Sequence, residues 1–565
     1  MSSCIGPVCF VPLDPNGPRI FGFSEFLTAL ALTVIAWTIA DVRYRFRIRV
    51  SPLPLHGLTF WVIAAVGGLT LLTDLWRAQA WLVPHGNLLT PASWQALLGA
   101  VFLLTFLLWV WFAYIRPPTY GKFNAKNYAE ALYHVILRGD GQNLAILADE
   151  LSRSARALIK FATLRDDCSG HPKTSSNAVR LDEDIGKVNA YANDILLLIA
   201  DRRFCRAMVA SSPGTAMAVF GQIARTGKYG VQIGVFARNF IGEALANKDS
   251  FLFHETEGYE TGLIGYQKPL SHAIFADYRM AEAIGTFYDQ PVWETRWDSS
   301  QWEVYCRIVL MTLRDYSKLG LPGHSYVLYR ALSNIKHAAI DIYKVNGVSN
   351  LEYRDDSLAK LRATVNFIRD AIRILDTLPI RSRLKLRLRD QDLAPHHFYD
   401  HIADLIFEVI YHAASVKSPA DSCWFIQHNV VWSELFNFGK LDGSAGRIIK
   451  FKVRRLLYDS IVSIPKLSGF QGASILGFCL NVMGLSVRDA KHDRDSLALH
   501  KAMLSWVRKN YATLYSDKPL LAEATLVDGL RYDEASLQLI RTYPADAFSR
   551  TPRRQHFRVE PPVPH

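Results

Sequence analysis

The sequence lacks the short motifs that mark the common nucleotide-hydrolysing and hydrolytic sites. Its 565 residues contain no GxxxxGK[ST] loop, no GxGxxG after a strand, no CxxC pair, no HExxH and no GxSxG. These absences argue against the usual ATPase, zinc-protease and serine-hydrolase designs. They leave an enzyme of unfamiliar design open, and they identify no cofactor.

Cysteine is also scarce, with seven residues in the whole chain. So few cysteines exclude a fold held together by disulfides. Five of them are scattered singly, as buried thiols in a reducing compartment would be. The other two, Cys4 and Cys9, lie together near the N-terminus.

Charge is almost absent from three windows near the N-terminus. They run from about Phe21 to Ala40, from about Leu55 to Thr73, and from Trp94 to Ile115. Roughly 20 apolar residues are needed to cross a hydrocarbon core about 30 Å thick. Buried core helices of a soluble protein are the alternative, but such helices usually carry a polar face. The sequence therefore predicts an integral membrane protein with a three-helix transmembrane anchor over residues 21–116.

Arginine and lysine flank these windows unequally. The loop after the first window holds Arg43, Arg45, Arg47 and Arg49, whereas the loop between the second and third has only Arg77. Because cytosolic loops carry the excess of Lys and Arg, we expect the arginine loop inside and residues 1–20 outside. Everything beyond residue 116 is then cytosolic, most simply beneath a bacterial inner (plasma) membrane.

This orientation gives Cys4 and Cys9 a role. Outside the membrane they would lie in an oxidising space, at a spacing that can close a small loop. The prediction is a disulfide between them, and the alternative is two unpaired thiols in a tail rich in Pro and Gly.

Beyond residue 117 the apolar residues fall mostly at helical spacing. Helices are expected near 181–210, 213–226, 234–247, 300–318, 324–345, 356–376, 398–414, 443–462 and 494–512. The fold class predicted is all-α, with one helical cytosolic domain over 117–543 or two that divide near residue 350. The charge-free stretch 467–487 contains Gln471, Asn481 and four glycines, which favours a buried helix over a further membrane span. Residues 544–565, rich in Pro and Arg, are expected to be a disordered tail.

The densest group of metal-ligand residue types follows Pro395. On one helix, five side chains would share a stripe roughly 80° wide at 100° per residue: His397, His401, Asp404, Glu408 and His412. Imidazole and carboxylate groups at such spacing can hold a transition metal or perform acid–base chemistry. The alternative is a solvated polar face, since Ile402, Leu405 and Val409 form an apolar face on another side.

A second group contains His254, Glu255, Glu257 and Glu260. It begins like HExxH, but Gly258 stands where the second histidine must be, so the zinc-protease interpretation fails. An acid–base or cation site remains open as a catalytic candidate, against the alternative of an acidic helix end.

A third group is basic. In extended geometry the alternation in residues 381–389 places four cations on one face: Arg383, Lys385, Arg387 and Arg389. Such a stripe can bind the phosphates of anionic lipid or nucleic acid. The absence of interleaved aromatic residues favours lipid over nucleic acid.

Together these patterns favour a membrane-anchored cytosolic sensor, effector or scaffold, which binds the lipid bilayer and a protein partner or further copies of itself. Ala64 and Gly68 have the spacing of close helix–helix contacts. The architecture is like that of membrane-anchored proteins of bacterial stress or anti-phage systems, an analogy that no motif supports. The alternative function is a membrane-bound, metal-dependent hydrolase that uses a His/Asp/Glu cluster.

Overall fold

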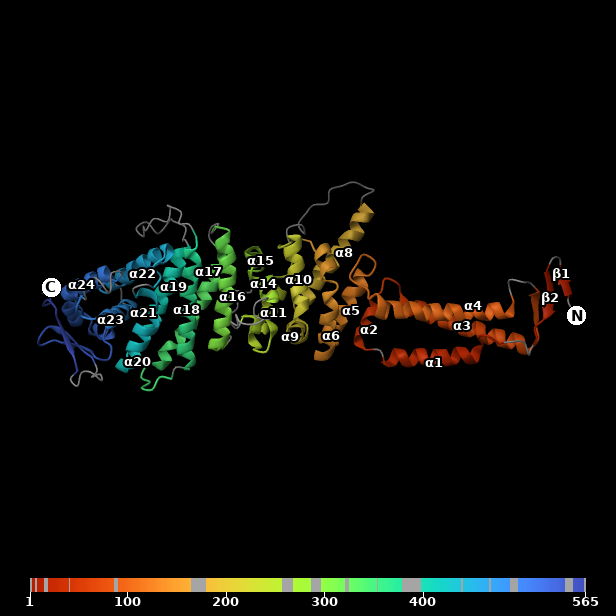
Figure 1. Cartoon of the computed structure of the whole chain (residues 1–565), viewed down its shortest axis with the longest axis horizontal. Helices are drawn as coiled ribbons and strands as arrows, with labels where there is room; N and C mark the ends of the chain where they lie inside the picture. Colours follow the sequence, from red (N-terminus) through yellow and green to blue (C-terminus); the bar gives the residue numbers. More distant parts are fainter. Residues whose placement is uncertain are drawn as a thin grey trace. The chain divides into compact units, whose positions relative to one another are not determined.

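The structure is a computed structural model of the full chain. It describes residues 3–5, 8–14, 19–39, 41–85, 90–163, 179–256, 268–285, 296–320, 325–352, 354–378, 398–437, 440–466, 469–487, 496–543 and 552–562. The chain divides into two compact units, Met1–Phe236 and Ala237–His565. Both are mostly helical, as Figure 1 shows, so the predicted all-α character is confirmed.

The first unit contains the membrane-type helices and a bundle of shorter helices. Its elements are β1 Ser3–Ile5, β2 Val8–Pro12, α1 Phe23–Ile39, α2 Val42–Arg49, α3 Leu55–Ala78, β3 Leu82–His85, α4 Pro91–Val110, the π-helix η1 Trp111–Ile115, α5 Ala125–Arg138, α6 Gly141–Ser152, α7 Ala155–Phe161, α8 Val179–Leu198, α9 Arg202–Ser211 and α10 Pro213–Thr226.

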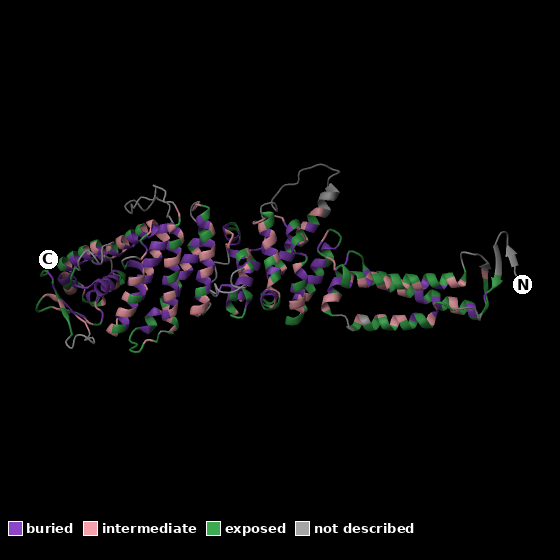
Figure 2. Ribbon diagram, in the orientation of Figure 1, coloured by how far each residue is buried: buried purple, intermediate pink, exposed green. Residues whose placement is uncertain are grey.

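Two helices of the described chain are long and apolar enough to cross a membrane. They are α3, with 24 residues, and α4 continued by η1, with 25 residues from Pro91 to Ile115. At 1.5 Å per residue each is about 36 Å long, more than the thickness of a hydrocarbon core. Large apolar side chains cover their outer surfaces: Trp61 is 73% exposed and Leu104 is 64% exposed. Figure 2 shows this outward exposure along α1, α3 and α4.

The prediction of three spanning helices is wrong in number, because α1 is too short. Its 17 residues extend over only about 25 Å. The helix covers only Phe23–Ile39, because the residues at the start of the first window belong to the non-helical segment that precedes it. At its start the Glu25 carboxylate accepts a hydrogen bond from the Gly22 N–H, and beyond Ile39 the chain turns into α2. Helix α1 packs on α3, where the Phe26 ring occupies the space beside Gly67.

A small antiparallel sheet joins the N-terminal strands to the loop between α3 and α4. Its order is β1-β2-β3, and Phe10 of β2 pairs with Pro84 of β3. In the β1–β2 pair the backbone places Cys4 directly opposite Cys9. The disulfide between them stays a prediction.

Helix α10 illustrates why local sequence sets the helix ends in this unit. Pro213 occupies its first turn, where a missing N–H is harmless, and Gly227 follows its end with a φ of +69°. Glycine adopts that left-handed conformation without steric cost. The predicted helix at 213–226 is found at these residues.

The second unit contains packed helices followed by a three-stranded sheet. Its elements are α11 Gly234–Ala246 (which begins in the last residues of the first unit), α12 Phe251–Thr256, α14 Pro269–Phe275, α15 Tyr278–Ile284, α16 Ser299–Lys318, α17 Tyr326–Ala338, the 3-10 helix η3 Ile340–Val345, α18 Asp356–Asp376, α19 Phe398–Ala413, α20 Ala420–Trp424, the π-helix η4 Phe425–Trp432, α21 Ser433–Phe436, α22 Ser444–Val462, α23 Gln471–Met483, α24 Leu497–Asp517, α25 Pro519–Ala524, β4 Leu530–Asp533, β5 Gln538–Thr542 and β6 Arg554–Arg558.

Helix α23 packs against α19, α22 and η4 in the second unit and is buried from Gly472 to Met483 except at Ser474. The expectation of a buried helix in 467–487 is therefore confirmed. The sheet of this unit has the order β4-β5-β6 and is antiparallel, with Leu539 opposite Phe557. Strand β6 lies inside 544–565, the range whose composition predicts a disordered tail, and the buried Phe557 and Val559 attach it to the fold.

Candidate functional site

The strongest polar constellation of the first unit lies where the helices of the membrane type end. Arg47 of α2 is 5% exposed, and Glu150 of α6 is 6% exposed. The Arg47 Nε donates to one Glu150 carboxylate oxygen at 2.8 Å, and its Nη2 donates to the other at 2.5 Å. The remaining Nη1 donates to the Ala113 carbonyl of η1 at 2.7 Å. One guanidinium thus joins α2, α6 and the end of the α4–η1 helix, and we call these three groups the Arg47 clamp.

Helical geometry explains how the sequence presents Arg47 to α6. Arg43 precedes Arg47 by four residues and so lies on the same face of α2. Its Nη2 lies 2.9 Å from an Asp149 carboxylate oxygen, and its Nε lies 3.5 Å from Glu150. Asp149 and Glu150 therefore face two arginines, of which Arg43 is partly exposed and Arg47 is buried.

Because the Arg47 clamp is buried, loss of one of its charged partners costs more than replacement of both. The hydrogen bond and the charge of Glu150 raise the pKa of the Arg47 guanidinium, against the opposing effect of desolvation. Removal of one partner from a buried ion pair leaves an uncompensated charge and costs about 3–5 kcal/mol. Replacement of both partners by apolar groups is often neutral. The Arg47 clamp is therefore expected to add little net stability over an apolar contact of the same shape, whereas loss of one partner alone is costly.

Other contacts hold the clamp in place. The Asn124 Nδ2 donates to the Val50 carbonyl at 2.7 Å, which fixes the end of α2 to the start of α5. The Phe46 ring meets the Tyr128 ring edge to face at 5.4 Å. Ile48 and Ala113 belong to one apolar cluster that also contains Trp109. The π-helical turn of η1 is an irregularity of the kind that is frequent at functional sites.

The predicted metal cluster is brought together only in part. His397 lies outside the described residues, and the other four candidates lie on α19: His401, Asp404, Glu408 and His412. Asp404 forms an ion pair with Lys336 of α17, and the His401 ring packs on Tyr329 at 4.9 Å. Among the described residues no group of three His, Cys, Asp or Glu side chains is placed to hold a metal ion.

Burial in this region shifts two pKa values in ways that disfavour charge. It raises the pKa of the half-buried Glu408 carboxyl. It lowers the pKa of His412, and the nearby His337 and Lys336 lower it further. The stripe thus faces α17, and its groups interact with α17 side chains such as Lys336 and Tyr329.

The second predicted cluster has a different outcome. Glu257 and Glu260 lie outside the described residues, and His254 is exposed on α12. The buried Glu255 carboxylate accepts hydrogen bonds from the N–H groups of Leu270 at 3.0 Å and Ser271 at 2.6 Å. These donors are the first N–H groups of α14, which lack partners within the helix. Glu255 therefore caps α14 with the favourable charge sign for that end.

The predicted basic stripe, Arg383, Lys385, Arg387 and Arg389, lies outside the described residues. In the basic helix α22, two lysines point into the fold. Lys450 is 3.1 Å from the Asp442 carboxylate, and Lys452 pairs with Asp400. These two cations therefore belong to the interior of the second unit and not to a surface for anions.

Sequence reasoning missed Glu150 and Ala113, and it treated Arg47 only as a sign of orientation. The one local signal was the four-residue spacing of Arg43 and Arg47 in α2, where arginines alternate with apolar and aromatic residues. It also missed a cavity of about 690 Å³ beside β5 in the second unit. There Arg541 donates to the Leu480 carbonyl at 2.9 Å and lies over the Tyr543 ring at 4.6 Å. Arg541 neutralises carbonyls at the end of α23, which is a structural role.

No protein-family model, no curated protein and no solved structure matches this chain.

Proposed function

We propose that the chain is a membrane-anchored sensor, effector or scaffold, in which the Arg47 clamp couples the membrane helices to the helices of the first unit. The anchor is formed by α3 and α4, whose apolar side chains are exposed along their length. In this proposal the arginine-rich α2 and everything beyond residue 116 are cytosolic. The N-terminal strands lie outside with β3, because β2 pairs with β3 in the loop between the two spans. The chain from β2 to α2 then passes from one side to the other, so α1, although too short to span by itself, lies in the membrane against α3.

The observation that carries the proposal is the buried contact of Arg47 with both Glu150 and the Ala113 carbonyl. An anchor that only tethered a domain could be joined to it by an exposed linker. Here a desolvated charge fixes α6 against the last turn of the α4–η1 helix. A shift of α6 would have to break these bonds or move η1, so the two elements respond together.

Self-association also belongs to the proposal. Ala64 and Gly68 are exposed on one side of α3, and a Cβ added to Gly68 would meet nothing within 4 Å. Small residues on a free helix face let a second helix approach closely in a membrane. The exposed spacing therefore supports contact with another copy of the chain.

The anchor is tested by fractionation and by topology. We expect the full chain to stay in the membrane pellet after alkaline carbonate extraction. A reporter that is active only in the cytosol should work when it is fused after His565. A reporter that is active only outside the membrane should work when it is fused to the N-terminus. Release by carbonate, or an external C-terminal reporter, would contradict the proposal.

The coupling is tested with variants of the Arg47 clamp. Glu150→Ala should destabilise the first unit by about 3–5 kcal/mol and speed deuterium exchange in both α6 and η1. The double variant Arg47→Met/Glu150→Leu should recover most of the stability, because no buried charge remains. Asp149→Ala is the matched control at the neighbouring exposed position, with an expected cost of about 0–1 kcal/mol. If Glu150→Ala changed exchange in α6 alone, η1 would not be coupled and this part of the proposal would fall.

A further inference from the structure

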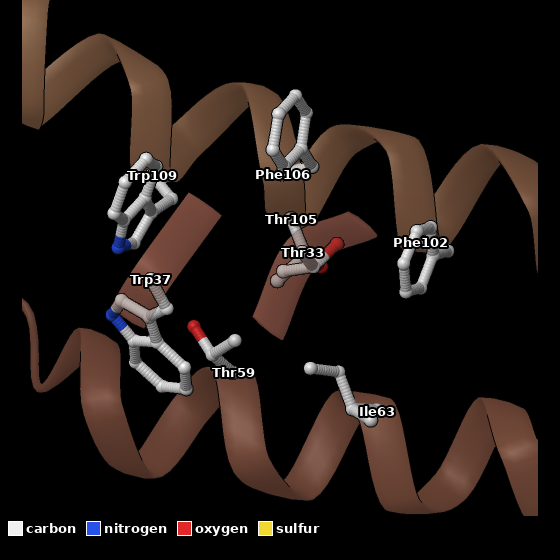
Figure 3. A pocket seen from close by; sticks show the side chains of 8 residues that line it. All are labelled: Thr33, Trp37, Thr59, Ile63, Phe102, Thr105, Phe106 and Trp109. Carbon is white, nitrogen blue, oxygen red and sulfur yellow. The ribbon is translucent and has the colours of Figure 1, made fainter. Parts of the chain in front are cut away.

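A small pocket lies between α1, α3 and α4, close to the end of these helices that carries the Arg47 clamp. Its lining residues come from all three helices, as Figure 3 shows: Thr33, Trp37, Thr59, Ile63, Phe102, Thr105, Phe106 and Trp109. Its volume of about 20 Å³ has room for one water-sized group. Aromatic rings form much of the wall around the hydroxyl groups of three threonines.

The pocket contains a buried donor that no described residue satisfies. Trp109 is 8% exposed, and its indole Nε1 has no hydrogen-bond partner. In Figure 3 this nitrogen lies on the side of the ring that faces Trp37, and the Thr59 hydroxyl is directed away from α3 into the same space. Thr33 and Thr105 already donate to the carbonyls four residues before them. The group missing from the pocket is therefore an acceptor oxygen.

The surroundings restrict what can supply this oxygen. In a hydrocarbon core an unpaired N–H costs several kcal/mol, because no water is present to accept from it. The rings of Phe102, Phe106 and Trp37 offer apolar contact to whatever carries the oxygen. An acceptor joined to a hydrocarbon chain fits both features.

The depth of the pocket indicates which acceptor is available. Trp109 precedes the exposed Arg116 by seven residues, or about 10 Å along the helix. The headgroup region on each side of a bilayer is about 5–8 Å thick, as the difference between total and hydrocarbon thickness gives. If Arg116 lies among the cytosolic headgroups, the pocket lies at the cytosolic edge of the hydrocarbon region. The ester carbonyls of phospholipids lie at this level.

We propose that this pocket binds a phospholipid of the inner leaflet through one ester carbonyl, which accepts from the Trp109 indole N–H. The acyl chain follows the wall formed by Phe102 and Phe106. Trp109 is one helical turn from Ala113, whose carbonyl accepts from Arg47, and both belong to one apolar cluster. An occupied pocket thus supports the η1 end of the Arg47 clamp. This inference rests on the proposed membrane anchor.

The test compares an ester-linked phosphatidylglycerol with its ether-linked analogue, which has the same headgroup and chains but no carbonyls. The full chain is purified in detergent and delipidated, and bound lipid is measured by native mass spectrometry. One hydrogen bond contributes about 1 kcal/mol net, so we expect the ester lipid to bind about fivefold more tightly. Trp109→Phe keeps an aromatic ring and loses the donor, so it should bind both lipids equally. Trp61→Phe, at an exposed tryptophan of α3 outside the pocket, is the matched control and should keep the difference.

Two results would overturn the inference. Equal binding of the two lipids by the wild-type chain would mean that only a water molecule fills the pocket. A preference that survives Trp109→Phe would assign the carbonyl to another site, and either result overturns the inference. If Trp109→Phe does not fold, Thr59→Val takes its place: the Trp109 donor stays, so the preference for the ester lipid should remain, and loss of the preference would overturn the inference. Carbonate extraction of wild-type membranes tests the anchor separately, so a failure of the anchor is distinguishable from a failure of lipid binding.

Discussion

Two parts of the chain are apolar and nearly free of charge, and the fold uses them in opposite ways. Helices α3 and α4 expose large side chains such as Trp61 and Leu104 along their length. Helix α23, with 13 residues, is enclosed by the second unit, and Leu476 is fully buried. Figure 2 shows the contrast directly. Hydropathy alone would group these segments together.

Helix α23 differs from α3 and α4 in two kinds of contact with the surrounding protein, side-chain amide hydrogen bonds and close backbone approach. The Asn481 amide of α23 donates to Gln427 Oε1 at 2.9 Å and accepts from Arg541 Nη2 at 3.0 Å. A Cβ added to Gly477 would lie 2.5 Å from the Thr525 carbonyl oxygen. Gly68 of α3 has nothing within 4 Å of the same position. Amide pairing and close backbone approach therefore distinguish a core helix from a membrane helix of similar hydropathy.

The largest expected effect comes from placing one lysine in each region. Leu476→Lys puts an unpaired charge in a closed core and should unfold the second unit, at a cost of roughly 5 kcal/mol. Leu104→Lys, at a side chain that is 64% exposed, should leave the fold intact but oppose membrane insertion by about 3 kcal/mol. Thermal denaturation in detergent and the carbonate-resistant fraction measure the two effects.

Leu476→Met and Leu104→Met are the matched controls, because they keep the volume and add no charge. A Leu104→Lys variant that inserts as well as the wild type would place this face of α4 against something other than lipid. A Leu476→Lys variant that keeps its melting temperature would show that α23 can reach solvent.

Much of the helical framework follows from local sequence. The predicted stretches 300–318 and 356–376 correspond to α16 Ser299–Lys318 and α18 Asp356–Asp376. Both helices begin after an aspartate, Asp298 or Asp355, whose carboxylate accepts from N–H groups of the first turn. Capping and apolar spacing act over a few residues, so a sequence displays them. The sheet β4-β5-β6 escaped prediction because its strands have four or five residues, too few for a clear alternation.

The candidate site could not be predicted in the same way. Arg47 and Glu150 are separated by 103 residues, and nothing local to either one specifies the other. Glu255 resembled part of a catalytic cluster, whereas its partners are backbone N–H groups of a helix that begins 14 residues later. Residue types indicate which chemistry is available, and tertiary packing decides which partner uses it.

A smaller effect is expected from the matched glycines of the two regions. Gly477→Ala in α23 forces the Thr525 backbone to move and should cost about 1–3 kcal/mol. Gly68→Ala in α3 meets no atom of its own chain, so in the monomer it should cost nothing or gain up to about 1 kcal/mol of helix propensity. Chemical or thermal denaturation of the two single variants, each in dilute detergent solution where the chain is monomeric, gives both values. Equal losses at the two sites would contradict the comparison, since they would place a close neighbour against Gly68 as well.

The smallest expected effect is a pH dependence confined to the enclosed helices. Burial lowers the pKa of His412, and of His337 on the facing α17, and the Lys336 charge adds to both shifts. A histidine with a lowered folded-state pKa contributes stability that is present above its unfolded pKa of about 6.5. This contribution is lost as the pH falls through the folded-state value. The raised pKa of Glu408 has the opposite effect: it lowers stability from about pH 4.3 upward, because that carboxyl holds its proton longer in the folded state.

Between pH 7.5 and 5.5 we therefore expect the second unit to lose less than about 1 kcal/mol of stability. His412→Gln should reduce that loss, whereas His254→Gln, exposed on α12, should not. Melting curves across this range measure the effect, and stability that rises toward pH 5.5 would show that Glu408 outweighs both histidines.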